Sequence, residues 1–406
     1  MEDIFTDFVL LANRVALHQD LQQRVIGKTF SLPLDSNSEY RYESACSAIA
    51  QFQLTGPEVD LGFDKLFAAY DSLQPDTKRV FLEALYAVAP RRYGPRVEKI
   101  LTTEVDPSRF SICATYLYQL QPSTEKGNAL KIAMVEHFPF ADSIETLRAL
   151  FLFLSRNPAR ERDKLPDMSA IFFHQRSRGN KVIYSFQNWN RDFPGLAILQ
   201  LADGHFARGA DGKLILVRQL ARSAANLPYF LTDGNTPQGI YSIQGLDQGH
   251  NHFIGPTPNI QLIMPFENKW EKFFPGSWTP GNDSLQLYLH LLPESWKFYL
   301  PMMEAWQAGK IGRTEIIAHG TTIDPEYYKD RPFYPLTPTQ GCLCAKEIWN
   351  SASGRLIESE QFKLIQAFQS TTGRAGYLFV INVSDAQAPI NAETVQAWVD
   401  AFEKKL

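Results

Sequence analysis

IIAHGT at residues 316–321 and TQGCLC at residues 339–344, joined by an aromatic-rich loop, are the segments from which the fold is first predicted. The paired isoleucines predict a short strand that ends at His319. Cys342 follows a glycine where the chain returns from the loop. A loop of this length closes at modest entropic cost, and a cysteine beside a histidine can act as nucleophile and base. We therefore expect His319 and Cys342 to meet in a groove open to ligand.

A second informative segment, TPQGIYSI, lies upstream at residues 236–243. Pro237 favours an extended conformation at the residue before it, and Gly239 lets the backbone pass close to another group. On local grounds the segment is either the entry to a hairpin or the edge of a ligand cleft. Its order relative to the cysteine segment favours the cleft edge.

These three segments together resemble the signature of the L,D-transpeptidase (YkuD-type) family. That family has His-Gly(-Thr) on one strand and Ser/Thr-x-Gly-Cys-hydrophobic-Arg/Asn after a loop. The resemblance covers about residues 180–385. It implies a YkuD-like β-sandwich or mixed-sheet domain with peripheral helices. It also implies cysteine-dependent acyl transfer on peptidoglycan stem peptides through a thioester acyl-enzyme, either cross-linking or carboxypeptidase trimming.

Two departures from the family pattern bear on ligand recognition. The loop between the histidine and the cysteine is longer than is usual in the family. Cys344 stands where the family has Arg or Asn, and a thiol cannot hold a carboxylate in the bidentate way that an arginine does. A second hypothesis therefore stays open, namely a cell-envelope scaffold without turnover that binds peptidoglycan or a protein partner.

The candidate site residues divide into a catalytic group and a binding group. Cys342 is the expected nucleophile and His319 the expected base, and the resemblance assigns the orienting carbonyl to Gly320. GHNH at residues 249–252 has no third ligand at zinc spacing, so no metal and no cofactor are expected. The candidate substrate-binding residues are Thr236, Pro237, Gly239, Tyr241, His252, Thr339, Gln340, Gly341, Leu343 and Cys344.

Composition excludes several classes of protein. The 406 residues carry a formal net charge of −4, which gives no electrostatic case for nucleic acid. Four cysteines form no disulfide framework, and Cys46 and Cys113 lie in apolar helical contexts that predict buried thiols. No apolar run approaches the ~20 residues that span a bilayer.

The location of the protein receives two conflicting signals. Residues 1–4, MEDI, lack the basic and apolar segments of a signal peptide, which alone predicts no export. The resemblance implies a periplasmic or cell-envelope location, and removal of a signal before Met1 would reconcile the two.

The first half of the chain predicts an all-α region over residues 1–160, an irregular bundle or a solenoid, that serves as a scaffold for a protein partner. Apolar residues recur at helical spacing and short breaks separate the helices. The expected helices near this spacing are 41–53, 60–73, 76–89, 93–103, 107–120, 125–137 and 142–155. Charged and breaker-rich residues predict a linker over 161–180.

The second half changes toward the alternating pattern of strands, which predicts the catalytic domain over residues 181–390. An aromatic-rich insertion at about 264–310 is either a lid over the cleft or a satellite hydrophobic cluster. Within it, alternation over 285–292 predicts a strand. Residues 391–406 predict a terminal helix.

Overall fold

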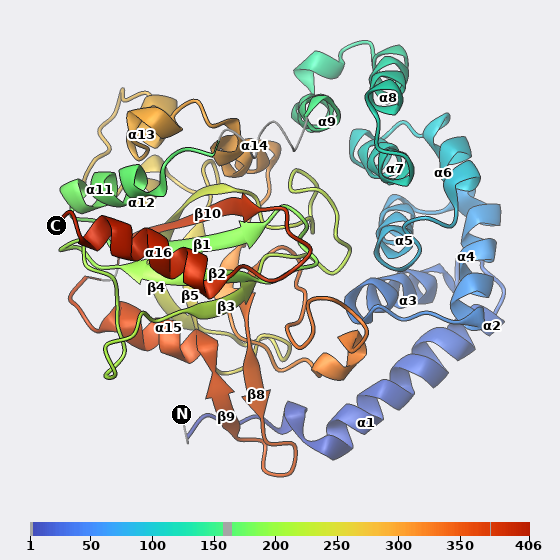
Figure 1. Ribbon diagram of the computed structural model, residues 1–406. Helices are drawn as coiled ribbons and strands as arrows, with labels where there is room; N and C mark the ends of the chain where they lie inside the picture. Colours follow the sequence, from blue (N-terminus) through green and yellow to red (C-terminus); the bar gives the residue numbers. More distant parts are fainter. Residues whose placement is uncertain (1–2, 157–164, 374) are drawn as a thin grey trace.

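The computed structural model describes residues 3–156, 165–373 and 375–406. Figure 1 shows two regions: an arc of helices that curves around one side, and a strand-rich body. The helices of the arc are α1 (Leu11–Asp20), α2 (Thr29–Ser31), α3 (Glu39–Phe52), α4 (Pro57–Ala69), α5 (Pro75–Val88), α6 (Gly94–Leu101), α7 (Pro107–Leu120), α8 (Thr124–His137) and α9 (Glu145–Ser155). The all-α prediction for the first region is therefore confirmed.

Local sequence explains where the helices of the arc begin. Proline occupies the first helical position of α4, α5 and α7, where its missing N–H costs no hydrogen bond. Asp106 and Ser123 cap α7 and α8 by accepting hydrogen bonds from the backbone of Arg109 and Lys126. A π-helical segment, Leu21–Lys28, joins α1 to α2 in one continuous rod.

The described strands of the body close into a barrel of eight, in the order β1-β10-β4-β5-β6-β7-β3-β2. Two neighbouring pairs, β1–β10 and β6–β7, are parallel. The barrel strands are β1 (Val182–Asn188), β2 (Gly195–Gln200), β3 (Val217–Leu220), β4 (Gly239–Gln248), β5 (Pro258–Ile263), β6 (Ile317–His319), β7 (Leu343–Ala345) and β10 (Gly376–Ser384). A separate ribbon contains β8 (Glu347–Trp349) and β9 (Leu356–Ser359).

The strand-rich second region is confirmed, but the expected sandwich is corrected to a closed barrel. Closure depends on two residue pairs between β3 and β7, Gln219 with Ala345 and Leu220 with Cys344. Such a short pairing between distant segments leaves no periodic signal in the sequence. It nevertheless removes the free edges of the sheet. One face of the sheet packs on α15 (Glu360–Gln369) and the other under α11 (Met168–Arg178) and α16 (Ala392–Glu403).

The segment expected to be a linker, 161–180, differs from that expectation. Residues 161–164 lie outside the described residues, and most of the remainder forms α11, which packs against α16. Asp167 caps α11 and Gly179 ends it in the left-handed conformation. Its apolar residues, including the fully buried Phe172, cover the barrel, which explains why this part of the expected linker folds as a helix.

The aromatic insertion packs on the outside of the barrel and forms α12 (Trp270–Phe273), α13 (Ser284–His290) and α14 (Glu304–Ile311). The strand expected at 285–292 is wrong, because Asp283 caps a helix there by accepting from Leu285 and Gln286. The Tyr288 hydroxyl donates to the carbonyl of Met302 at 2.7 Å and accepts from the Ile240 N–H of β4 at 3.0 Å, which fixes this helix against β4. The insertion is a hydrophobic cluster on the wall of the barrel.

The arc and the barrel share one hydrophobic core. A barrel loop enters the concave side of the arc, where Phe230 contacts the ring of Phe153 at 5.7 Å. Gln53 donates to the carbonyl of Ala224 at 2.7 Å, and the ammonium of Lys310 lies 2.7 Å from Glu145. The concave face of the arc is therefore occupied by the protein itself.

Within the described part of the chain, no helix combines the length and the apolar character needed to cross a membrane.

Candidate active site

His319 ends β6, and Cys342 directly precedes β7, the strand that pairs with β6. β6 and β7 run parallel with His319 opposite Cys344, and Cys342 lies two positions before Cys344. Because side chains alternate along a strand, His319 and Cys344 share the face opposite to Ala318 and Leu343. The diagonal places the α-carbons of His319 and Cys342 roughly 8 Å apart, and the thiol itself contacts the backbone of Ile317 and Glu315.

Both residues line one pocket of about 340 Å³. Cys342 is half-buried, whereas His319 is 5% exposed. One wall comes from the barrel and its loops. The opposite wall comes from the last two turns of α3, which contribute Ser47, Ala48 and Phe52. The candidate site therefore lies between the arc and the barrel.

The His319 ring is held as a neutral base. Its Nδ1 bonds to the carbonyl oxygen of Gly320, which fixes Nδ1 as the donor and leaves Nε2 as the acceptor. Burial lowers the pKa of His319 to about 4, and the Gly320 bond opposes this only in part. At neutral pH the ring is therefore uncharged and able to accept a proton at Nε2.

The Cys342 thiol is protonated at rest. Burial raises its pKa to about 11, although the Ile317 N–H and the nearby Arg313 cation act in the opposite direction. The Ile317 N–H donates to Sγ at 3.5 Å, and Sγ donates to the carbonyl of Glu315 at 3.5 Å. A neutral thiol that shares a pocket with a neutral imidazole loses its proton as the new bond forms, not beforehand.

Two threonines brace the turn that carries Cys342. Thr339 Oγ1 donates to the Cys342 carbonyl at 2.9 Å and accepts from the Gly341 N–H at 3.1 Å. Thr236, fully buried, donates to the Gly341 carbonyl at 2.8 Å. The upstream segment thus lies beneath the turn and supports it from the protein side.

Gly341 needs to be glycine for two reasons. Its φ of +113° is one that side chains rarely adopt. A β-carbon there would also lie 2.5 Å from Nη2 of Arg313 and 2.9 Å from the Gly234 carbonyl. This close contact places a buried guanidinium directly behind the turn that carries Cys342.

Arg313 is a functional candidate that the motif analysis missed. Its Nη2 donates to Gly234 at 2.9 Å, and its Nη1 donates to the carbonyls of Tyr229 and Asn235. Its positive charge favours the thiolate form of Cys342. No motif surrounds this arginine; its only sequence signal is a basic residue directly after the glycine that ends α14.

Glu347 is the second residue that was missed, and it lies behind His319. Its carboxylate packs where a β-carbon on Gly320 would be, at 2.2–2.4 Å. It accepts from the Thr321 N–H at 3.0 Å and from Ser359 Oγ at 2.6 Å. Burial raises the pKa of Glu347 to about 7.

The remaining candidate residues divide between the pocket and the interior. Thr339 and the exposed Gln340 line the pocket. Leu343 and Cys344 are fully buried, and burial raises the pKa of Cys344 to about 12. His252 is exposed on an adjacent loop, where it stacks on Phe8 at 5.8 Å.

The upstream candidates Pro237, Gly239 and Tyr241 are also buried. Tyr241 donates to the Pro237 carbonyl at 2.7 Å. A β-carbon on Gly239 would lie 2.7 Å from the side chains of Ala305 and Tyr288, so Gly239 admits the aromatic insertion. Direct substrate contact by this segment, and by Leu343 and Cys344, does not fit their burial.

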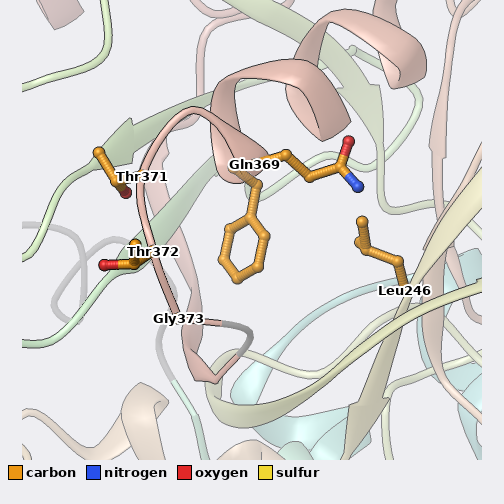
Figure 2. A pocket seen from close by; sticks show the side chains of 6 residues that line it. Leu246, Gln369, Thr371, Thr372 and Gly373 are labelled. Atoms are coloured by element: carbon orange, nitrogen blue, oxygen red, sulfur yellow. The ribbon is translucent and has the colours of Figure 1, made fainter.

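Another pocket, of about 490 Å³, lies between β4 and the segment that follows α15. Leu246 and the amide of Gln369 lie on one side of it, and Thr371 and Thr372 on the other (Figure 2). Its described lining residues include no acid, base or thiol. It therefore offers no chemistry comparable with that of the Cys342 pocket. Among the described residues, no group of three or more His, Cys, Asp or Glu side chains could hold a metal ion.

Comparisons with protein-family models, with curated proteins and with solved structures found no match to this chain.

Proposed function

We propose that the protein is a cysteine acyltransferase of the L,D-transpeptidase type that acts on peptidoglycan stem peptides in the cell envelope. The observation that carries the proposal is the shared pocket of Cys342 and His319, whose imidazole is neutral and oriented by Gly320. The substrate and the location come from the resemblance of the three sequence segments. The chemistry comes from the residues of the pocket.

In the proposed reaction, Sγ of Cys342 attacks the carbonyl carbon of a substrate amide while Nε2 of His319 takes the thiol proton. The imidazolium then returns this proton to the leaving amine as the C–N bond breaks, which leaves a thioester on Cys342. An amine or a water attacks the thioester, Sγ departs, and His319 moves the second proton in the same way. The cycle ends with the thiol protonated and the imidazole neutral.

The surroundings support this sequence of proton transfers. Burial makes the neutral pair the stable resting state, so the proton moves only when a carbonyl is present. Arg313 stabilises negative charge that develops near Cys342. The Gly341 N–H is already bonded to Thr339, so it would stabilise an oxyanion only after exchanging that partner.

A second candidate function is an envelope scaffold that binds peptidoglycan without turnover. The raised pKa of Cys342 favours this alternative, because it makes the resting thiol a weak nucleophile. The replacement of the family's Arg or Asn by the buried Cys344 favours it as well. The two functions differ in whether a covalent adduct forms.

Intact-protein mass spectrometry distinguishes them. The full chain is incubated with synthetic stem peptides, each supplied as the free acid and as the carboxamide. We expect a thioester adduct on Cys342 that is lost in Cys342→Ala and kept in Cys344→Ala. If no donor forms an adduct, the scaffold function is favoured. If the adduct survives in Cys342→Ala, the assignment of the nucleophile is wrong.

A further inference from the structure

The Cys342 pocket lacks charge on its described walls. Its lining consists of hydroxyl and amide side chains, such as Gln51 and Asn251, and of apolar ones, such as Phe253 and Ile254. Among its described lining residues the titratable groups are the Cys342 thiol and the His319 ring, and both are neutral at pH 7. A charged ligand group would therefore find no counter-ion on the described lining.

Among the charged groups near the site, Glu315 and Asp233 raise the pKa of Cys342 but do not line the pocket, and Arg313 and Glu347 are directed away from it. The Arg313 guanidinium lies behind Gly341, and its N–H groups donate to three backbone carbonyls. The Glu347 carboxylate lies behind Gly320 and accepts from Thr321 and Ser359. Neither can reach a ligand without breaking bonds that hold the turns of Cys342 and His319.

Helix α3 supplies the wall opposite the thiol. Ser47 and Gln51 are one helical turn apart, so they lie on the same side of α3. The wall is anchored, because the Gln51 carbonyl accepts from the Tyr328 hydroxyl at 2.7 Å. Below it, the ring of Phe52 lies 4.8 Å from that of Tyr327. The pocket therefore has a fixed width and a fixed, uncharged face on the arc side.

We propose that this pocket selects an uncharged acyl segment, a peptide whose carboxyl groups are carboxamides, and that Ser47 and Gln51 of α3 determine this specificity. The inference rests on the proposed function for the identity of the acyl donor. A carboxylate that entered the pocket would lose its water without gaining an ion pair, which is costly. A carboxamide would instead form hydrogen bonds with the hydroxyl and amide side chains of the pocket.

The first test needs no acyl transfer. Alkylation of Cys342 by iodoacetamide and by iodoacetate is followed by peptide mapping of the full-length protein, with N-acetylcysteine as the reference thiol. We expect the ratio of the iodoacetamide rate to the iodoacetate rate to exceed that of the reference thiol by about tenfold or more, the size of one unpaired buried charge. A ratio equal to that of the reference thiol overturns the proposal.

Matched variants on α3 locate the specificity. Ser47→Arg adds a cation to the pocket wall and should reduce the ratio by roughly two- to fivefold, the range of a partly exposed ion pair. Ser44→Arg is the control, because both serines are exposed on α3 and each donates to the carbonyl four residues before it. An equal effect of Ser44→Arg, or none of Ser47→Arg, overturns the role of the α3 wall.

The stem peptides connect this inference with the function while keeping the two distinguishable. Carboxamide donors should acylate Cys342 faster than their free acids, and Ser47→Arg should narrow the difference. If free acids react as fast as carboxamides, the specificity is wrong although the function stands. If neither donor acylates Cys342 while the alkylation ratio stays high, the proposed function is wrong. The inference that the pocket disfavours a carboxylate still holds in that case.

Discussion

The two walls of the Cys342 pocket are built in different ways. On the barrel side, His319 ends β6 and Cys342 directly precedes the paired strand β7, and backbone contacts fix both reacting groups. On the arc side, α3 presents Ser47 and Gln51, which offer a hydroxyl and an amide but no acid, base or thiol. The comparison indicates that the barrel provides the chemistry and the arc provides the shape and polarity of the ligand site.

The largest expected effect tests the barrel wall. His319→Gln removes the proton acceptor, so acylation of Cys342 should fall about 10²–10⁴-fold. The rate is measured by mass spectrometry with a carboxamide donor. Ser47→Ala, which removes only one hydrogen-bonding group from the opposite wall, should reduce the rate by at most about fivefold. Comparable losses in both variants would show that the walls do not divide their tasks.

The next prediction concerns the packing that holds the arc wall in place. Phe52 is 5% exposed and contacts the rings of Tyr327 and Phe253. Phe52→Ala should lower the free energy of unfolding by about 3–5 kcal/mol, because it leaves a cavity at the junction of the two regions. Urea denaturation measures the change. Phe140→Ala, at a position that is 75% exposed, should stay within about 0.5 kcal/mol. A small effect of Phe52→Ala would mean that the packing of Phe52 contributes little to holding α3 against the barrel.

A third prediction uses the buried acid behind His319. The pKa of Glu347 in the folded protein is about 7, above its ordinary value of 4.5. Folding therefore favours the protonated acid, and its contribution to stability is lost as the pH rises from about 4.5 to 7. Glu347→Gln removes this loss, so the variant should gain up to about 3 kcal/mol relative to wild type over that range.

Urea denaturation at several pH values measures this difference. The opposite slope contributed by His319 is common to both proteins and cancels. Glu358→Gln, on the strand that pairs with Glu347, serves as the control, since Glu358 is half-buried and ion-paired with Lys363 at 3.5 Å. A flat difference between Glu347→Gln and wild type would contradict the burial of a titrating acid behind the histidine.

The smallest expected effect concerns the brace beneath the nucleophile. Thr236→Val keeps the shape of the side chain but removes its hydrogen bond to the Gly341 carbonyl. We expect a loss of about 1–2 kcal/mol in unfolding free energy, with a few-fold slower acylation. Thr102→Val, at an exposed threonine of the arc, is the matched control. Unchanged acylation in Thr236→Val would show that the turn holds its geometry without the brace.

Much of the arc could be predicted from local sequence. The expected helix at 107–120 agrees with α7 because a capping aspartate and a proline mark its start. The expected strand at 285–292 is wrong because apolar alternation over a few residues is a weaker signal than a helix cap. Asp283 provides that cap, and a helix begins there. Closure of the barrel could not be predicted, since it depends on two pairs between segments far apart in the chain.

The candidate site likewise divides into residues that local motifs predict and residues that only tertiary packing brings together. Short motifs indicated Cys342 and His319, which do line one pocket. Arg313, Glu347 and the α3 wall carry no motif, because tertiary packing alone brings them to the site. The segment at 236–243 shows the reverse: its motif pointed to the ligand cleft, whereas its residues lie under the turn of Cys342.

The pairing of β1 with β10 has a consequence for how the chain matures. These parallel strands are the first and last of the barrel, so the barrel cannot close until nearly the whole chain has been synthesised. The arc, whose helices make mostly neighbouring contacts, can fold much earlier. During synthesis the concave face of the arc would therefore stay uncovered until the barrel forms. A chaperone that binds exposed apolar surface would act on the chain mainly during this interval.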